Sequence, residues 1–167
     1  MPPVLETARL VFRRFEPGDL DALAALYADP EIRRFFPEGI LTRAETHEEV
    51  TFFLNGHPKN QDLGLWAAIE RETGAFVGRC GLLPWTIDGV EEVEVAFLIA
   101  KDRWGEGLAT EAARGLVTYA HERLGLARLI CLIMYGNEAS VRVAEKAGFR
   151  FEREHTDEYG PCMIYAR

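Results

Sequence analysis

The chain has 167 residues, with 19 Lys+Arg, 27 Asp+Glu and a formal net charge of −8. This length supports one domain with its own hydrophobic core, and no apolar run approaches the roughly 20 residues of a membrane helix. The acidic balance argues against duplex nucleic acid as a partner, because phosphate backbones require clustered Lys and Arg. We therefore expect a single domain over residues 1–167, with a cytoplasmic location as the default because residues 1–9 lack a secretory pattern.

Cysteine and histidine usage gives no sign of a disulfide framework or a metal site. Cys80, Cys131 and Cys162 are odd in number and widely spaced, without a C-x-x-C pair. Four scattered histidines have no paired ligand spacing. Cys131 falls in an apolar run, where a free cysteine behaves as a small hydrophobe and not as a nucleophile.

The first half of the chain predicts a strand, two helices and then a β meander. Residues 10–15 have a strand pattern, and a helix from Pro17-Gly18-Asp19 ends before Pro30. Thr42 and Glu45 form a capping box that begins a second helix.

Three β-prone runs follow, at residues 63–70, 75–83 and 91–100, with turn signals between them. In the last run Val93, Val95, Phe97 and Ile99 alternate with Glu92, Glu94, Ala96 and Leu98.

The second half predicts alternating helices and strands. A long apolar stripe indicates a helix from Leu108 to Leu124-Gly125, and residues 129–135 indicate a buried central strand. A short helix over 137–148 and strands at 149–154 and 162–165 complete the chain. This order predicts an α+β fold: a mixed sheet of six or seven strands with helices on both faces.

A glycine turn joins the strand at 91–100 to the long helix. Gly105 and Gly107 leave the backbone of this turn almost free of side chains, so its amides and the helix dipole could hold a phosphate. Taken alone, G-x-G is weak evidence, because tight turns use glycine for geometry only.

Two motifs carry a resemblance to the GNAT superfamily of acetyl-CoA-dependent N-acyltransferases. The acyl-CoA signature Q/R-x-x-G-x-G/A falls on residues 104–109, matching at Gly107 and Ala109 but with Trp104 in place of Gln or Arg. Residues 137–149 are similar to N-x-x-S-x-x-v-x-e-K-x-G-F of the branch that acetylates ribosomal-protein N-termini, the RimJ/RimL type. Thr7-Ala8-Arg9-Leu10 also fits this branch.

The resemblance implies a GNAT-type sheet splayed around an acyl-CoA cleft. It implies transfer of acetyl from acetyl-CoA to a primary amine by direct attack in a ternary complex, with a protein or peptide N-terminus as the expected acceptor and no metal. Backbone groups of the strand before the glycine turn would hold the oxyanion and the pantetheine arm, and the turn would hold the diphosphate. The donor-binding residues implied are Phe97, Leu98, Ile99, Trp104, Gly105, Glu106, Gly107, Leu108, Ala109, Thr110, Asn137 and Ser140.

The resemblance also guides the choice of catalytic residues. Glu94 is the expected base, with Glu92 as runner-up, although both could be a solvated charge row. Ala144 occupies the position that often carries a catalytic tyrosine, so Ser140 is the expected hydrogen-bond partner of the coenzyme sulfur; a serine so near a helix start could equally serve the cap. Asn137 could be the cap, a pantetheine contact or both.

Two further groups of side chains could contribute to the site or have only an ordinary structural role. Arg142 and Lys146 could reach coenzyme phosphates or be solvated. Trp66, Trp85 and the segment Phe35-Phe36-Pro37 could line the acceptor pocket or belong to the core.

The acceptor side of the implied cleft leaves the substrate class open. Five acidic residues that could border it would suit a cationic acceptor, namely Glu31, Glu38, Glu154, Asp157 and Glu158. An acetyltransferase of small amines such as antibiotics, polyamines or amino acids, and a non-catalytic acyl-CoA sensor, remain as alternatives. A homodimer is compatible with the resemblance.

Overall fold

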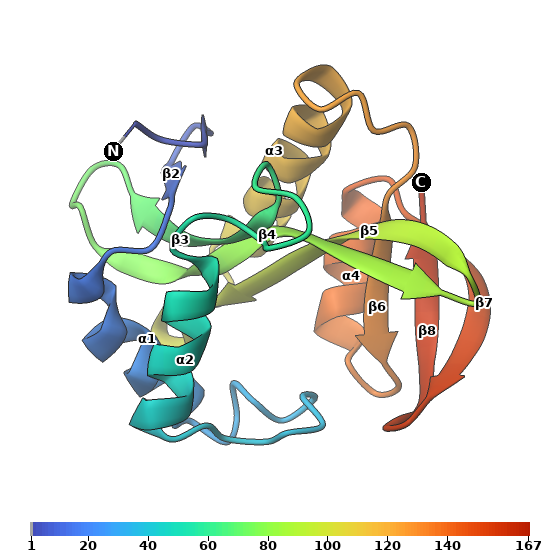
Figure 1. Cartoon of the computed structure of the whole chain (residues 1–167), viewed down its shortest axis with the longest axis horizontal. Helices are drawn as coiled ribbons and strands as arrows, with labels where there is room; N and C mark the ends of the chain where they lie inside the picture. Colours follow the sequence, from blue (N-terminus) through green and yellow to red (C-terminus); the bar gives the residue numbers. More distant parts are fainter. Residues whose placement is uncertain (1) are drawn as a thin grey trace.

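An eight-stranded sheet forms the centre of the structure, a computed structural model that describes residues 2–167 (Figure 1). The strands lie in the order β1-β2-β3-β4-β5-β6-β8-β7, and only β5 and β6 are paired in parallel. The mixed α+β architecture is therefore confirmed. The strands are β1 (Leu5–Glu6), β2 (Leu10–Arg13), β3 (Gly64–Glu70), β4 (Phe76–Ile87), β5 (Val90–Ile99), β6 (Ile130–Met134), β7 (Arg150–Asp157) and β8 (Gly160–Ala166).

The sheet has one strand more than the six or seven that the sequence predicts. The additional strand is β1, which pairs with β2 through Leu5 opposite Phe12 and Glu6 opposite Val11. Because β1 has two residues, it is too short to show the alternating pattern by which strands are detected.

Four α-helices pack against this sheet: α1 (Leu20–Tyr27), α2 (Arg43–Phe53), α3 (Leu108–Glu122) and α4 (Glu138–Lys146). The predicted capping box begins α2, since Thr42 Oγ1 accepts from the Glu45 N–H at 3.2 Å and the Glu45 carboxylate accepts from the Thr42 N–H at 2.7 Å. Two short 3-10 turns, Pro17–Asp19 and Lys101–Arg103, precede α1 and α3.

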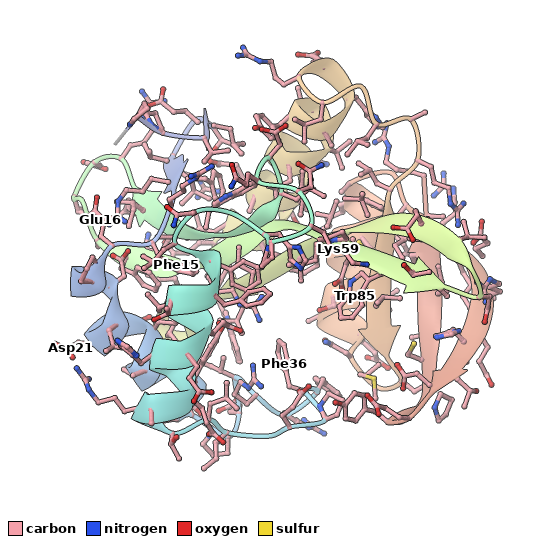
Figure 2. The ribbon with its side chains drawn as sticks, viewed as in Figure 1. Phe15, Glu16, Asp21, Phe36, Lys59 and Trp85 are labelled. Atoms are coloured by element: carbon pink, nitrogen blue, oxygen red, sulfur yellow. The ribbon has the colours of Figure 1, made fainter. Side chains whose placement is uncertain are left out.

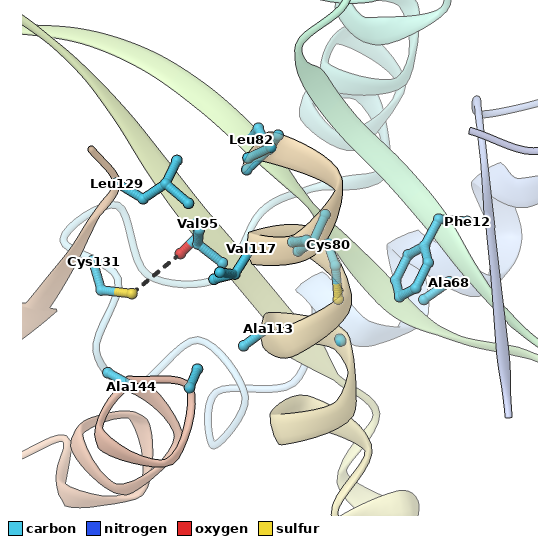
Figure 3. Packing of buried hydrophobic residues seen from close by; sticks show 14 of the residues in the cluster. Phe12, Ala68, Cys80, Leu82, Val95, Ala113, Val117, Leu129, Cys131 and Ala144 are labelled. Carbon is cyan, nitrogen blue, oxygen red and sulfur yellow. Dashed lines mark hydrogen bonds between the residues drawn. The ribbon is translucent and has the colours of Figure 1, made fainter. Parts of the chain in front are cut away.

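The two faces of the sheet carry two hydrophobic clusters, as the alternation in β5 predicts. Val95 and Ile99 pack with residues of α3 and α4, and part of this cluster is drawn in Figure 3. Ala96 and Leu98 point to the opposite face and pack with residues of α1 and α2. Helices therefore cover both faces, and β5 is buried from both sides over its second half.

The sheet splays where β5 meets β6. Only one residue pair, Glu94 with Ile130, registers the two parallel strands, and beyond it they diverge (Figure 1). Within this opening the Cys131 thiol donates to the Val95 carbonyl oxygen at 3.7 Å (Figure 3). Burial, together with the nearby Glu94 charge, raises the pKa of Cys131 well above its usual value, so this thiol is not a ready nucleophile.

Across residues 2–167 no helix is long and apolar enough to cross a membrane. The same residues contain no group of three or more His, Cys, Asp or Glu side chains that could hold a metal ion.

Candidate active site

A cavity of about 510 Å³ lies beside the end of β5, next to the point where β5 and β6 diverge. Its wall combines the end of β5, the turn before α3, the first turns of α3 and α4, and the loop between α1 and α2. All but one of the donor-binding residues expected from the sequence line it, namely Phe97, Leu98, Ile99, Trp104, Gly105, Gly107, Leu108, Ala109, Thr110, Asn137 and Ser140. Glu106 is the exception.

The turn before α3 presents a run of unused backbone amides to this cavity. Gly105 and Gly107 adopt left-handed backbone angles, with φ of +81° and +79°, which glycine reaches without strain. Within the described residues, the N–H groups from Gly105 to Thr110 donate no hydrogen bond, and α3 has no side-chain cap. These amides and the positive end of the α3 dipole together form a site suited to an anion.

Trp104 connects this turn to the end of β5. Its indole Nε1–H donates to the Ile99 carbonyl oxygen at 2.8 Å, while the residue is 48% exposed. Trp104 thus replaces the usual Gln or Arg with a side chain that holds the turn against the strand and also lines the cavity.

A clamp from the N-terminal segment holds the other side of the turn; we define it as Thr7, Arg9 and Glu111. The Glu111 carboxylate accepts from the Thr7 hydroxyl at 2.6 Å and from the Arg9 Nε and backbone N–H, both at 2.8 Å. Arg9 also donates to the Glu106 carbonyl oxygen at 2.8 Å. Glu106 therefore supports the turn through its backbone, and its side chain pairs with Arg103 at 2.8 Å instead of lining the cavity.

Removing the carboxylate of this clamp should weaken the fold and loosen the turn. Glu111→Ala is expected to cost about 1–2 kcal/mol of unfolding free energy and to lower Tm by roughly 2–8 °C, because three donors lose a partly buried acceptor. Burial opposes ionisation of Glu111, but the bonds from Thr7 and Arg9 outweigh it and lower its pKa. The difference from wild type should therefore be full above about pH 5 and shrink as the pH falls through the lowered pKa.

Thermal denaturation between pH 3 and 7 measures this effect. Glu122→Ala, at the exposed far end of the same helix, is the matched control and should leave Tm nearly unchanged. Equal losses for the two variants at all pH values would contradict the proposed role of the clamp.

The start of α4 separates the two roles weighed for its polar residues. Asn137 is the cap, since its Oδ1 accepts from the Ser140 N–H at 3.3 Å. The Ser140 hydroxyl makes no hydrogen bond to the described residues, so it is not used for capping and is free toward the cavity that it lines. Ala144 is fully buried and supplies no hydroxyl.

Cationic side chains border the cavity on several sides. Arg142 and Lys146 line it, as one of the two sequence interpretations expects. Arg34 and Arg103 also line it and were not singled out by the sequence. Arg34 lies in a loop and Arg103 in a three-residue 3-10 turn, and both segments are too short or irregular for a periodic pattern to indicate the direction of a side chain.

Glu94 lies beside the cavity but is not part of its wall. It is half-buried on β5, three residues before Phe97, and its carboxylate accepts from the Trp85 indole N–H at 2.9 Å. Burial raises the pKa of Glu94 to about 6, although the Trp85 hydrogen bond, the Arg79 charge and the Leu132 amide oppose the shift. This carboxyl group can therefore exchange a proton near neutral pH.

Glu92, the runner-up base, is held in an ion pair. Its carboxylate accepts from Arg128 at 3.0–3.1 Å, and Arg128 also binds Glu152 at 2.8 Å. The oxygens of Glu92 are thus already occupied by the forked guanidinium of Arg128. Arg128 thus bridges Glu92 on β5 and Glu152 on β7, which is a structural role.

Aromatic residues divide between core and cavity. Trp66 is buried in the core, while Phe35 and Phe36 line the cavity. In Figure 2 Phe36 reaches inward from the loop after α1, and Trp85 lies across the open middle of the molecule from it.

Three of the five acidic residues considered for the acceptor side have side-chain partners of their own. Glu31 pairs with Lys101 at 2.5 Å, and Glu38 lies 3.7 Å from Arg33. Glu154 accepts from the Tyr135 hydroxyl at 2.5 Å. These contacts reduce the negative charge available to a cationic acceptor.

Comparisons with known proteins agree with this geometry. The family profile described as "Acetyltransferase (GNAT) domain" matches residues 9–150. The uncharacterised protein YkkB of Bacillus subtilis is 32% identical over 98% of this chain and 94% of its own length. YdaF of Bacillus subtilis, provisionally named a ribosomal N-acetyltransferase, is 33% identical over 89% of this chain and 81% of its own length.

Among solved structures, a GNAT-family acetyltransferase from Bacillus anthracis superposes with a TM-score of 0.82 at 25% identity, covering 98% of this chain and 96% of that chain. The match of the family over most of the chain, the relatives and the shared fold agree. The chain therefore belongs to the GNAT acetyltransferase domain family and is an acetyl-CoA-dependent N-acetyltransferase.

Proposed function

We propose that this enzyme transfers the acetyl group to the α-amine of a peptide or protein N-terminus, in a ternary complex. The observation that carries the proposal is the run of unused amides from Gly105 to Thr110 at the wall of the 510 Å³ cavity. Such a run binds a diphosphate without a lysine clamp. The likeness to YdaF and the motif at residues 137–149 support the choice of acceptor.

The donor is assigned to the cavity beside the end of β5. Acetyl-CoA supplies an acyl thioester. The amides from Gly105 to Thr110 receive the diphosphate, and the backbone of Phe97 to Ile99, at the cavity wall, receives the pantetheine arm and the thioester oxygen. Arg142 and Lys146 add positive charge beside the phosphates.

Glu94 is assigned as the base that takes a proton from the acceptor ammonium. An α-amine has a reference pKa of about 7.7–8.0, so a carboxylate whose own pKa is about 6 can accept this proton near neutral pH. Glu94 lies beside the cavity and not in its wall. The proton therefore reaches it through one water, or directly if the Glu94 side chain extends past Ala96.

Ser140 is assigned to the leaving sulfur, toward which its free hydroxyl donates a hydrogen bond. Ser140→Ala should lower kcat by roughly tenfold with little change in the KM for acetyl-CoA, because one neutral hydrogen bond made in the transition state contributes about 1–1.5 kcal/mol. Steady-state kinetics of thiol release measures this. Ala139→Ser, one position earlier in the same turn and also lining the cavity, is the matched control and should retain kcat. Full activity of the Ser140 variant would remove the assignment.

The acceptor is tested with a panel of peptides, polyamines, aminoglycosides and amino acids, by thiol release and mass spectrometry of the products. Turnover of peptides supports the proposal. Turnover of small amines alone replaces it with a small-molecule acetyltransferase. Coenzyme binding without turnover on any acceptor, including a cell extract, would contradict acetyl transfer and indicate a sensor.

A further inference from the structure

Arg79 on β4 is a buried cation whose charge is not matched by an adjacent carboxylate. The residue is 5% exposed, and its Nε donates to the Tyr27 hydroxyl at 2.7 Å. Tyr27 in turn donates to Glu49, so the carboxylate is one step removed from the guanidinium. Among the described residues no carboxylate oxygen lies within 4.0 Å of Arg79, an arrangement that is unfavourable for a buried charge.

The two terminal nitrogens of Arg79 have no partner among the described residues and are not fully sealed from solvent. Neither has a hydrogen-bond partner among residues 2–167, where Nε alone is used. Yet no side-chain nitrogen or oxygen that is sealed from solvent lacks a partner in this part of the chain. The forked end of Arg79 therefore keeps unused donors that are not completely shut off from solvent.

The position of Arg79 places this fork beside the proposed reaction centre. Arg79 is paired with Leu98 across β4 and β5, and Leu98 lines the cavity. Leu98, Ala96 and Glu94 share one face of β5, with only a methyl group between the first and the last. Arg79 thus lies opposite the middle of the backbone stretch assigned to the thioester, and Glu94 lies four residues before Leu98, about 14 Å away along the strand.

A second buried guanidinium strengthens the positive potential. Arg33 is 4% exposed and lies 4.1 Å from the centre of the Phe36 ring, and Arg79 lies 5.4 Å from the same ring. Phe36 lines the cavity, so both cations sit directly behind its wall. Arg33 Nε itself donates to the Gly39 carbonyl oxygen at 2.7 Å, and the Arg33 guanidinium faces the half-exposed Glu38.

We propose that Arg79 binds a carboxylate of the acetyl acceptor, so that the acceptor is a primary amine carrying a carboxylate a few bonds from its nitrogen. A guanidinium fork matches a carboxylate in two parallel hydrogen bonds, and burial strengthens them. Two sources share this chemistry: a free amino acid, and a peptide that begins with Asp or Glu. The inference rests on the proposed function, since it concerns the acceptor of that same site.

Matched acceptors test the proposal. We expect kcat/KM to be roughly 10- to 100-fold higher for the carboxylate member of each pair, the amino acid over its amide or the Asp peptide over its Asn counterpart, as charge-assisted hydrogen bonds provide. The pair that shows the ratio identifies the source. Arg79→Gln should bring the ratio to about one, and Arg79→Lys, which keeps the charge but not the fork, should retain part of it.

One control variant and one fallback keep the outcome decisive. Arg43→Gln, on the exposed outer side of α2, should keep the wild-type ratio. If Arg79→Gln does not fold, the proposal is judged by the kcat/KM ratios of the wild type and of Arg79→Lys. Equal kcat/KM within every pair for the wild type, or an equal loss for both members in the Arg79 variants, would overturn the proposal.

A failure of turnover is kept distinct from a failure of this inference. In Glu94→Gln with coenzyme A present, calorimetric titration compares the amino acid with its amide, and the Asp peptide with its Asn counterpart. A preference for the carboxylate that disappears in the Glu94→Gln/Arg79→Gln double variant supports the carboxylate site even without catalysis. No preference in this titration overturns it, whatever the turnover.

Discussion

Glu94→Gln is expected to lower kcat/KM for the acceptor by roughly 100- to 10,000-fold, the usual contribution of a positioned general base. The wild-type carboxyl group has a pKa of about 6 because burial disfavours its charge. Below that pH it is protonated and cannot accept the amine proton, so kcat/KM should fall as the pH drops through about 6. The glutamine variant should lack this acidic limb, which a pH–rate profile from pH 5 to 9 measures.

Trp85→Phe provides a graded variant for the same assignment. The indole N–H stabilises the charged form of Glu94 at 2.9 Å, so its removal should raise the pKa further and move the acidic limb to higher pH. Activity at high pH should then be largely retained. A glutamine variant with the wild-type rate and profile would show that Glu94 is not the base.

Gly107→Asp is expected to weaken coenzyme A binding by on the order of 100-fold. The carboxylate would occupy the place assigned to the diphosphate, and like charges about 4 Å apart near a protein surface repel by about 4 kcal/mol before screening by salt. The nearest atom to a Cβ at Gly107 is an Arg9 nitrogen at 3.6 Å, so the side chain itself has room. Isothermal titration with coenzyme A at two salt concentrations measures the loss and its screening.

The backbone cost of this substitution can be separated from the charge effect. Gly107 and Gly125 lie at the two ends of α3 with similar left-handed φ, +79° and +67°, and both are uncrowded. Alanine at either position should cost about 1–2 kcal/mol of stability. Only the change at Gly107 should alter coenzyme binding. Unchanged binding in Gly107→Asp would contradict the placement of the diphosphate.

The sequence predicts those parts of the fold that depend on residues close together in the chain. The alternation in residues 91–100 assigns the two faces of β5, and the Thr42 capping box marks the start of α2. The glycine turn and the polar residues at the start of α4 are likewise contiguous in the chain, so the two motifs indicate most of the cavity wall.

The parts that the sequence does not predict depend on contacts between distant segments. Alternation puts Glu92 and Glu94 on the same face, and only Arg128, 36 residues further on, distinguishes them by pairing with Glu92. Arg79 lies in a run that reads simply as a strand, and its burial beside Tyr27 arises from the packing of α1 on β4. Arg34 reaches the cavity from an irregular loop, where no spacing rule applies.

The amides from Gly105 to Thr110 belong to the main chain, which every residue type except proline supplies in the same form. The groups that we propose to meet the acceptor are instead side chains, contributed by β4, β5 and the loop after α1. Mutation can therefore redirect the enzyme to new amines while its hold on the donor persists. Enzymes of this architecture can therefore differ in their acceptors and still share one acyl donor.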